Sequence, residues 1–211
     1  MRKLKSLGLL FLSVICFSSC DWLFGHKDPV FHYTVYNLAI GFRDASGSDL
    51  VKGIGLKDRQ SGVSMEDAKW GEVDSDQYRL DIMVDIPCWN WSNDTYDTPS
   101  RPATGPFEVK RPQLDIYYYD EICYLHNYFE LPVEDCPDQR KLTYKLKCPY
   151  VFGDKEVHEL VTYWDIPTEK PVPTTYAKCL RIEFGGDEFI PEKREEEGRG
   201  YWVVINWNGR E

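Results

Sequence analysis

The chain has 211 residues, a formal net charge of −10 at pH 7 and 42% hydrophobic residues. This length suits one domain, or at most two small ones, and supplies enough apolar residues for a core. The acidic balance argues against nucleic acid and anionic lipid headgroups as partners. The 14 Tyr and 7 Trp residues favour β-strands over helices.

The first twenty residues have the pattern of a bacterial lipoprotein signal. Three basic residues at the start precede an apolar run over residues 7–17, which is too short to span a bilayer as a helix. The segment Phe17-Ser18-Ser19-Cys20 resembles a lipobox, in which an apolar residue and two small residues precede Cys. We expect cleavage before Cys20, a diacylglycerol thioether on its sulfur and an acylated new N-terminus, for example with palmitate. The alternative is an ordinary secreted chain that begins at Cys20.

This signal predicts three segments and an address. Residues 1–19 form the signal peptide, residues 20–29 the lipidated Cys and a tether, and residues 30–211 a single domain. Because each buried CH₂ adds about 0.8 kcal/mol, three acyl chains hold a protein on a membrane firmly. We expect an outer-membrane lipoprotein of the cell envelope, periplasmic or surface-exposed. Asp21, which directs inner-membrane retention in some bacteria, leaves the membrane and leaflet open.

Apolar and polar residues alternate with a period of two through much of the domain, which is typical of half-buried strands. Turn clusters rich in Gly, Pro, Asp and Ser separate the runs. The expected strands cover residues 36–43, 50–56, 80–86, 114–118, 123–131, 142–148, 157–164, 176–184 and 201–207. About nine strands without a convincing helical period predict an all-β fold, an antiparallel β-sandwich of Ig-like or jelly-roll type.

The connections include three polar stretches. Residues 57–75 are expected to form a loop, and residues 192–200, with three consecutive Glu, a solvated segment. Residues 87–112 form a long irregular connection, and such loops in compact domains are often functional.

The long connection carries the best candidate for a ligand site. In an extended segment, Trp89 and Trp91 share a face, and flat indole rings suit the CH groups of sugars. The neighbouring Asp94 and Asp97 can accept hydrogen bonds from hydroxyls. The alternative is that the two Trp side chains close one end of the sandwich as part of the core.

Metal sites are weaker hypotheses. Two acidic pairs are candidates for calcium: Asp94 with Asp97, and Asp74 with Asp76. Neither pair lies in an EF-hand loop. Cys123 and His126, together with Cys136 and His158, are residue types that can bind zinc. In a strand, however, Cys123 and His126 point to opposite faces. No resident metal is therefore expected.

Five Cys residues remain after the signal is removed and Cys20 is lipidated. They are Cys88, Cys123, Cys136, Cys148 and Cys179. An odd number leaves at least one unpaired. Cys123 and Cys136 flank a predicted turn and are the first candidates for a disulfide, while the other thiols are expected to include buried core residues.

The segment Tyr144-Lys145-Leu146-Lys147-Cys148-Pro149-Tyr150-Val151-Phe152-Gly153-Asp154, with Glu188-Phe189 downstream, resembles uncharacterised lipoproteins of Gram-negative gut-type bacteria. The resemblance covers roughly the last third of the chain and implies a β-sandwich lipoprotein of unknown function. It transfers no catalytic residue.

The sequence favours a non-enzymatic binding or accessory module with a glycan as ligand. The alternative is a structural envelope protein that docks on a protein partner. A hydrolase is less favoured, since the chain has no G-x-S-x-G elbow, phosphate loop or dinucleotide fingerprint.

Overall fold

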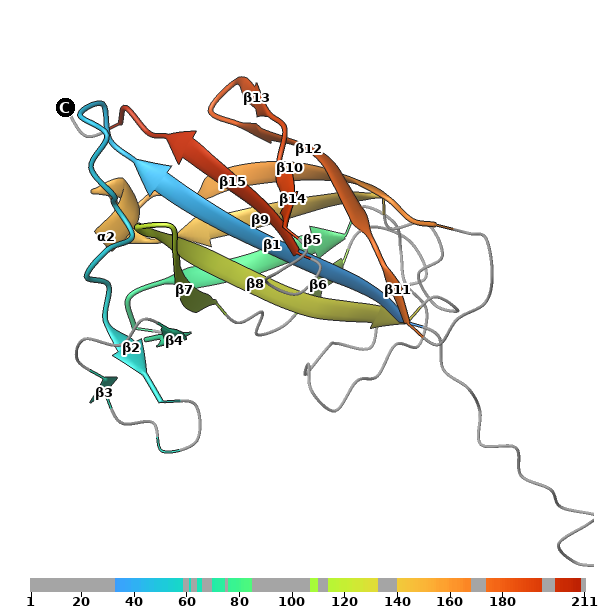
Figure 1. Ribbon diagram of the computed structural model, residues 1–211, viewed down its shortest axis with the longest axis horizontal. Helices are drawn as coiled ribbons and strands as arrows, with labels where there is room; N and C mark the ends of the chain where they lie inside the picture. The colour runs from blue at the N-terminus through green and yellow to red at the C-terminus, as the bar shows by residue number, and fades with distance from the viewer. Residues whose placement is uncertain are drawn as a thin grey trace, which may run out of the picture. The chain divides into compact units, whose positions relative to one another are not determined.

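The computed structural model divides the chain into Met1–Phe31 and His32–Glu211, and the second unit is shown in Figure 1. The described residues are 33–58, 61, 64–65, 70–74, 76–84, 107–109, 114–132, 140–167, 174–194 and 200–209. The expected signal, the tether and most of the long connection lie outside them. Within the described part, no helix is long and apolar enough to cross a membrane.

The described residues form two β-sheets and one short helix, α2 (Pro149–Phe152). The larger sheet contains, in spatial order, β14 (Glu192–Arg194), β15 (Gly200–Asn206), β1 (Tyr33–Arg43), β8 (Ile122–Pro132), β7 (Asp115–Tyr119), β4 (Trp70–Val73), β2 (Leu56–Lys57) and β3 (Ser64–Met65), with β11 (Thr174–Tyr176) paired to β1. The smaller sheet contains β13 (Asp187–Phe189), β12 (Lys178–Phe184), β10 (His158–Asp165), β9 (Lys141–Lys147), β5 (Arg79–Val84) and β6 (Phe107–Val109).

The all-β sandwich predicted from the sequence is confirmed, with differences in detail. The described residues form fifteen strands rather than about nine, but six of these have only two or three residues. Pairing is antiparallel except along one edge of β1, where β15 and β11 both run parallel to it. Parallel pairing arises there because β15 and β11 come from distant parts of the chain and reach β1 without a hairpin.

Four segments differ from the sequence prediction. Residues 107–109 of the long connection, expected to be irregular, form strand β6, which pairs with β5. Residues 50–55 form a turn with buried apolar side chains instead of a strand, and residues 57–75 contain short strands where a loop was expected. In residues 192–200, Glu192–Arg194 is strand β14, paired with β15. Strands of two to four residues show no readable period, so only their pairing partners reveal them.

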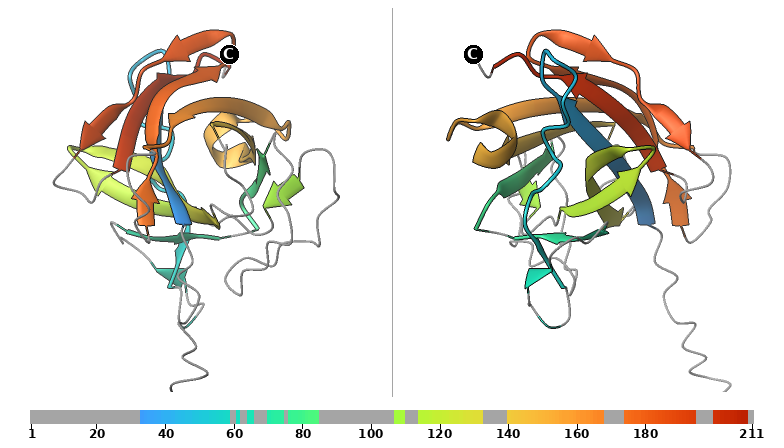
Figure 2. Two further views of the ribbon diagram at one scale, coloured as in Figure 1. Left: turned by 90° about the vertical axis from the view of Figure 1, so that its right-hand side faces the viewer. Right: turned by 60° about the vertical axis from the view of Figure 1, so that its left-hand side comes forward.

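The core lies between the two sheets, which face each other in Figure 2. Tyr36 and Phe42 on the inward phase of β1 are fully buried. Tyr36 meets Trp164 of the smaller sheet edge to face with 5.1 Å between ring centroids, and Phe42 meets Phe184 at 5.8 Å. Such aromatic pairs add about 0.5–1.5 kcal/mol each beyond their burial.

The outward face of the smaller sheet is polar and carries ion pairs. Arg79 Nε lies 2.6 Å from Asp81 Oδ2, and Arg181 Nη1 lies 2.8 Å from Glu188 Oε2. This is the ordinary pattern for a sheet with one face in water. The outward face of the larger sheet does not follow it.

Candidate functional site

Most of the site residues expected from the sequence lie outside the described residues. These are Cys20, Trp89, Trp91, Asp94, Asp97 and Cys136. Their lipidation, ligand-binding and disulfide roles stay predictions.

Cys123 and His126 are described, and they point to opposite faces of β8. Cys123 packs in the core, where its backbone N–H donates to Asp49 Oδ2 at 2.7 Å. His126 Nε2 lies 2.6 Å from Asn37 Oδ1 on the outward face. Burial raises the pKa of the Cys123 thiol to about 11, and the Asp49 carboxylate adds to the rise. Cys123 carries a free thiol in the structure, and its pairing with Cys136 stays a prediction.

The acidic pair Asp74 and Asp76, a candidate for calcium in the sequence, makes interactions within the protein. Asp74 Oδ1 accepts hydrogen bonds from Lys57 Nζ at 2.7 Å and from the Asp76 N–H at 3.0 Å. Among the described residues, no group of three or more His, Cys, Asp or Glu is placed to hold a metal ion. The structure therefore gives this pair a role in an ion pair with Lys57.

The outward face of the larger sheet carries a buried aromatic cluster, which we call the outer cluster. Its members are Ala39, Ile122, Tyr124 and Trp202, with Tyr117, Tyr119 and Val204 packed against them. The strand register explains the grouping, because Tyr117 pairs with Tyr124 across β7 and β8, and Ala39 pairs with Trp202 across β1 and β15. Large aromatic side chains here are unusual, since the outward phase of a sandwich strand is normally polar.

Trp202 is the centre of the outer cluster. Its ring meets Tyr124 edge to face with centroids 4.7 Å apart, and Tyr119 at 5.7 Å. The Arg194 guanidinium lies over Tyr119, 4.6 Å from the ring centroid, and 5.4 Å from that of Trp202. A cation in this position is attracted by the aromatic faces. Arg194, from the edge strand β14, therefore covers the aromatic rings.

Gly41 of β1 allows the Tyr124 ring to lie on the sheet. A Cβ at this position would be 3.2 Å from Tyr124 Cε1, closer than ordinary van der Waals contact. The ring covers the gap left by the missing side chain, as aromatic residues beside strand glycines commonly do.

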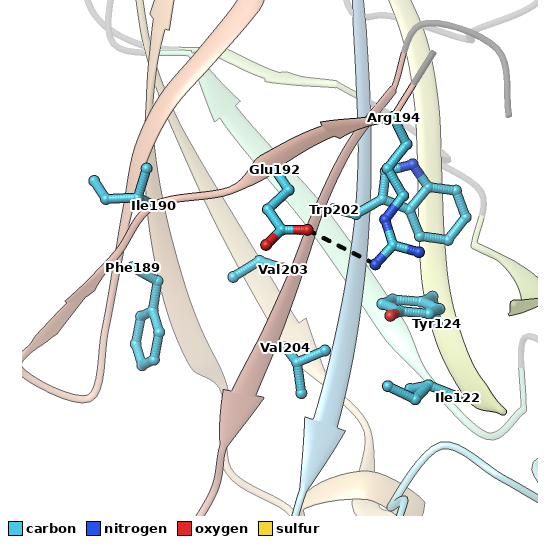
Figure 3. A pocket seen from close by; sticks show the side chains of 9 residues that line it. All are labelled: Ile122, Tyr124, Phe189, Ile190, Glu192, Arg194, Trp202, Val203 and Val204. Atoms are coloured by element: carbon cyan, nitrogen blue, oxygen red, sulfur yellow. Dashed lines mark ion pairs between the residues drawn. The ribbon is translucent and has the colours of Figure 1, made fainter. Parts of the chain in front are cut away.

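A pocket of about 310 Å³ opens beside the outer cluster, as Figure 3 shows. It is lined by Ile122, Tyr124, Phe189, Ile190, Glu192, Arg194, Trp202, Val203 and Val204. The lining mixes apolar side chains with polar ones, and it contains one ion pair, in which Arg194 Nη2 lies 3.9 Å from Glu192 Oε2. The Glu192 side chain is 79% exposed, so this pair is weak.

Buried polar atoms around the pocket lack hydrogen-bond partners among the described residues. They are Arg43 Nε, Arg194 Nη1, Tyr124 Oη and Trp202 Nε1. Arg194 interacts with the Tyr124 hydroxyl as a weak hydrogen-bond donor, but the contact lacks the geometry of a full hydrogen bond. Burial raises the pKa of Tyr124, and the positive charges of Arg194 and Arg43 oppose that rise. Since an unpartnered buried donor typically costs about 1–3 kcal/mol, an acceptor near these atoms would stabilise the cluster.

The sequence contained a signal for part of this site. The inward phases of β8 and β15 were predicted from their apolar residues, which places Tyr124 and Trp202 on the outward phase. A large aromatic residue on that phase marks a face that is not simply solvated. Arg194 gave no such signal, because it lies in the charged segment at residues 192–200.

The chain matches no protein-family model, no curated protein and no solved structure. The fold defines the class of the protein as an all-β sandwich.

Proposed function

We propose that this chain is an envelope lipoprotein, anchored through Cys20, whose β-sandwich binds a glycan without catalysing a reaction. The observation that carries the proposal is the pocket beside the outer cluster, where aromatic rings and unpartnered hydrogen-bond donors occur together. We place the protein at the outer membrane, as expected from its signal.

Glycans suit such a pocket for a chemical reason. A sugar ring offers apolar CH groups on its faces and oxygen atoms around its rim. Val204 and Ile122 give the pocket apolar side chains, while the guanidinium of Arg194, whose side chain is 23% exposed, can donate hydrogen bonds to oxygen. Binding sites of this kind combine mostly apolar walls with a few placed polar groups. The contrast with the paired charges on the smaller sheet singles out this face.

The test is a thermal unfolding screen of the full chain, purified in detergent, against a panel of polysaccharides. A ligand that binds the folded state raises its stability by about 2.7 kcal/mol at a hundred times its Kd. We expect at least one polysaccharide to raise the melting temperature. A flat panel combined with a cooperative melt would contradict the proposal.

Two sets of variants locate the binding surface. Trp202→Phe removes the indole from the wall of the pocket, and Trp89→Ala with Trp91→Ala removes the indoles of the long connection. We expect Trp202→Phe to weaken the shift. If only the Trp89 and Trp91 variants abolish it, the glycan binds at the long connection rather than in the pocket.

The second candidate function is docking on a protein partner of the envelope. Ile190, at the mouth of the pocket, is 68% exposed, and the neighbouring β14 pairs only with β15 among the described strands. An exposed apolar residue beside a free strand edge is suited to strand addition by another chain. Co-purification of one defined envelope protein, lost in Ile190→Asp and without any polysaccharide response, would favour this function.

A further inference from the structure

Two arginines, one on each outward face of the sandwich, lie over tyrosine rings, but only one has close carboxylate partners. Arg181 lies 3.7 Å from the centroid of the Tyr163 ring and donates to both Glu183 and Glu188. Arg194 lies over Tyr119 in the same manner, and its ion pair among the described residues is the 3.9 Å contact with exposed Glu192. In both sites an arginine covers a tyrosine ring, but among the described residues only Arg181 has a carboxylate at hydrogen-bond distance.

A second guanidinium, that of Arg43, lies near the same tyrosine, Tyr124. Arg43 follows Ala39 and Gly41 on the outward phase of β1, and its buried Nε has no hydrogen-bond partner. No ion pair to Arg43 is found within the described parts of the chain. Arg43 and Arg194 both act on the Tyr124 hydroxyl, opposing the rise in its pKa that burial causes. Two cationic groups therefore approach one buried hydroxyl from two different strands.

The chemistry of the unpartnered atoms identifies what is missing. The guanidinium and indole nitrogens can only donate hydrogen bonds, and the Tyr124 hydroxyl can donate one as well. A group that only accepts would satisfy all of them, and an anionic acceptor would also balance the arginines. A guanidinium matches a carboxylate in a planar, two-point arrangement.

The surrounding charges favour a single negative charge over a multiply charged group. Glu192 lines the same pocket, and Asp120 is near enough to raise the pKa of Tyr124. These carboxylates partly offset the arginines, so the pocket itself suits a group with one negative charge, such as a single uronate residue of an oligomer. The volume of about 310 Å³ is at the small end for ligand sites and fits a group of about the size of one sugar ring.

We infer that the pocket beside Arg194 binds the carboxylate of an acidic sugar residue, with the Arg194 guanidinium as its donor and with Tyr124 and Trp202 in the wall beside it (Figure 3). The inference rests on the proposed glycan-binding function and specifies its ligand class. The carboxylate accepts from Arg194, while the sugar ring packs on the apolar wall at Val204 and Ile122. Sulfate and phosphate esters are the competing anions.

The test is calorimetric titration of the full chain in detergent with matched oligosaccharides. The arms are oligogalacturonate, the neutral galactose oligomer of the same length, a sulfated oligosaccharide and free acetate. We expect oligogalacturonate to bind at least about tenfold more tightly than its neutral counterpart, a difference typical of one charge-assisted contact. Added salt should reduce that advantage.

Three variants assign the effect to the pocket. Arg194→Met should bring oligogalacturonate down to the affinity of the neutral oligomer. Arg181→Met is the matched control on the opposite face, and it should leave both affinities unchanged. Tyr124→Phe should also weaken oligogalacturonate binding while keeping or raising stability, because it removes an unpartnered buried hydroxyl. This last variant tests the inference even if Arg194→Met fails to fold.

The outcomes separate the inference from the function on which it rests. If acidic and neutral oligomers bound equally, and Arg194→Met and Tyr124→Phe had no effect, the inference that the pocket binds a carboxylate would be wrong. The proposed glycan-binding function would still stand. Preference for the sulfated arm, or acetate binding as tightly as the oligomer, would also overturn it. A wider glycan panel without any binding would reject the proposed function itself.

Discussion

Thr162 is a polar residue in the middle of the core, and its hydroxyl connects two other groups. Trp164 Nε1 donates to Thr162 Oγ1 at 2.7 Å, and Thr162 Oγ1 donates to the Leu142 carbonyl at 3.1 Å. Both side chains are almost completely buried. The hydroxyl thereby supplies the partner that the buried indole N–H needs.

Thr162→Val keeps the shape but removes this partner. We expect it to lower the free energy of unfolding by about 1–3 kcal/mol, because the Trp164 N–H is left buried without an acceptor. Urea denaturation followed by Trp fluorescence measures the change. Thr143→Val is the control, because Thr143 lies half-buried on the outward phase of β9 and should change stability little. Equal losses in both variants would contradict the role given to the hydroxyl.

Gly41 tests how tightly the outer cluster is packed. Gly41→Val should cost about 1–3 kcal/mol, since its Cβ would press on the Tyr124 ring. The same substitution in a Tyr124→Ala background should cost clearly less, because the ring is gone. The comparison of the four proteins by urea denaturation isolates this contact. If the losses of stability from Gly41→Val and Tyr124→Ala were additive, the Tyr124 ring would not be the reason why residue 41 is a glycine.

At the level of elements, β2 is tied to the turn after β4 by the pair of Lys57 and Asp74. The hydrogen bond from Lys57 and the Asp76 N–H hold the pKa of the Asp74 carboxyl below its ordinary value. The same hydrogen bond raises the pKa of Lys57. A lowered carboxyl pKa stabilises the fold above the unfolded value of about 3.9, and this contribution is lost as the pH falls through the folded pKa. A raised ammonium pKa stabilises the fold below about 10.4, and this is lost as the pH rises through the folded pKa.

We therefore expect Asp74→Asn to lower stability most between about pH 4 and pH 10, and less as the pH falls through the folded pKa of Asp74 or rises through that of Lys57. Urea midpoints measured at pH 3, 7 and 11 check this. Lys57→Met should show the same window. A constant difference at all three pH values would assign the effect to packing rather than to the charge pair.

The long strands could be predicted from the sequence because their two faces differ. The inward residues of β1, Tyr36 and Phe42 among them, recur with period two, and the structure buries them. The short strands β2, β3 and β4 could not be predicted, because two to four residues carry no period and their places depend on pairing that begins at β7.

The candidate site was only partly within reach of the sequence for the same reason. The outward phase of Tyr124 and Trp202 follows from a correct strand pattern. Their approach to Arg194 does not, because it depends on parallel pairing of β15 with β1 and on a hairpin that brings β14 beside β15. Long-range register of this kind leaves no local trace in composition or spacing.

At the scale of the whole molecule, the two outward faces of the sandwich have different chemistry. The face with Arg181 holds close ion pairs, in which Arg79 and Arg181 each have a carboxylate partner. The face with Arg194 holds buried aromatic rings and donors without acceptors. Unpartnered buried groups lower stability and are retained mostly where they serve binding. This difference points to the larger sheet as the functional side of the domain.

The lipid anchor that we propose at Cys20 would determine where that domain works, and substitution of Cys20 tests the proposal. We expect the full chain to sediment with membranes and to incorporate labelled palmitate, because several acyl chains on one protein give nearly permanent attachment. Cys20→Ala should leave the protein in the soluble extract of the envelope without any label. Cys16→Ala is the matched control, since the expected cleavage removes that residue, and it should behave like the parent. A Cys20→Ala protein that still sediments, from a parent that never takes up label, would show that another feature of the chain attaches it to the membrane.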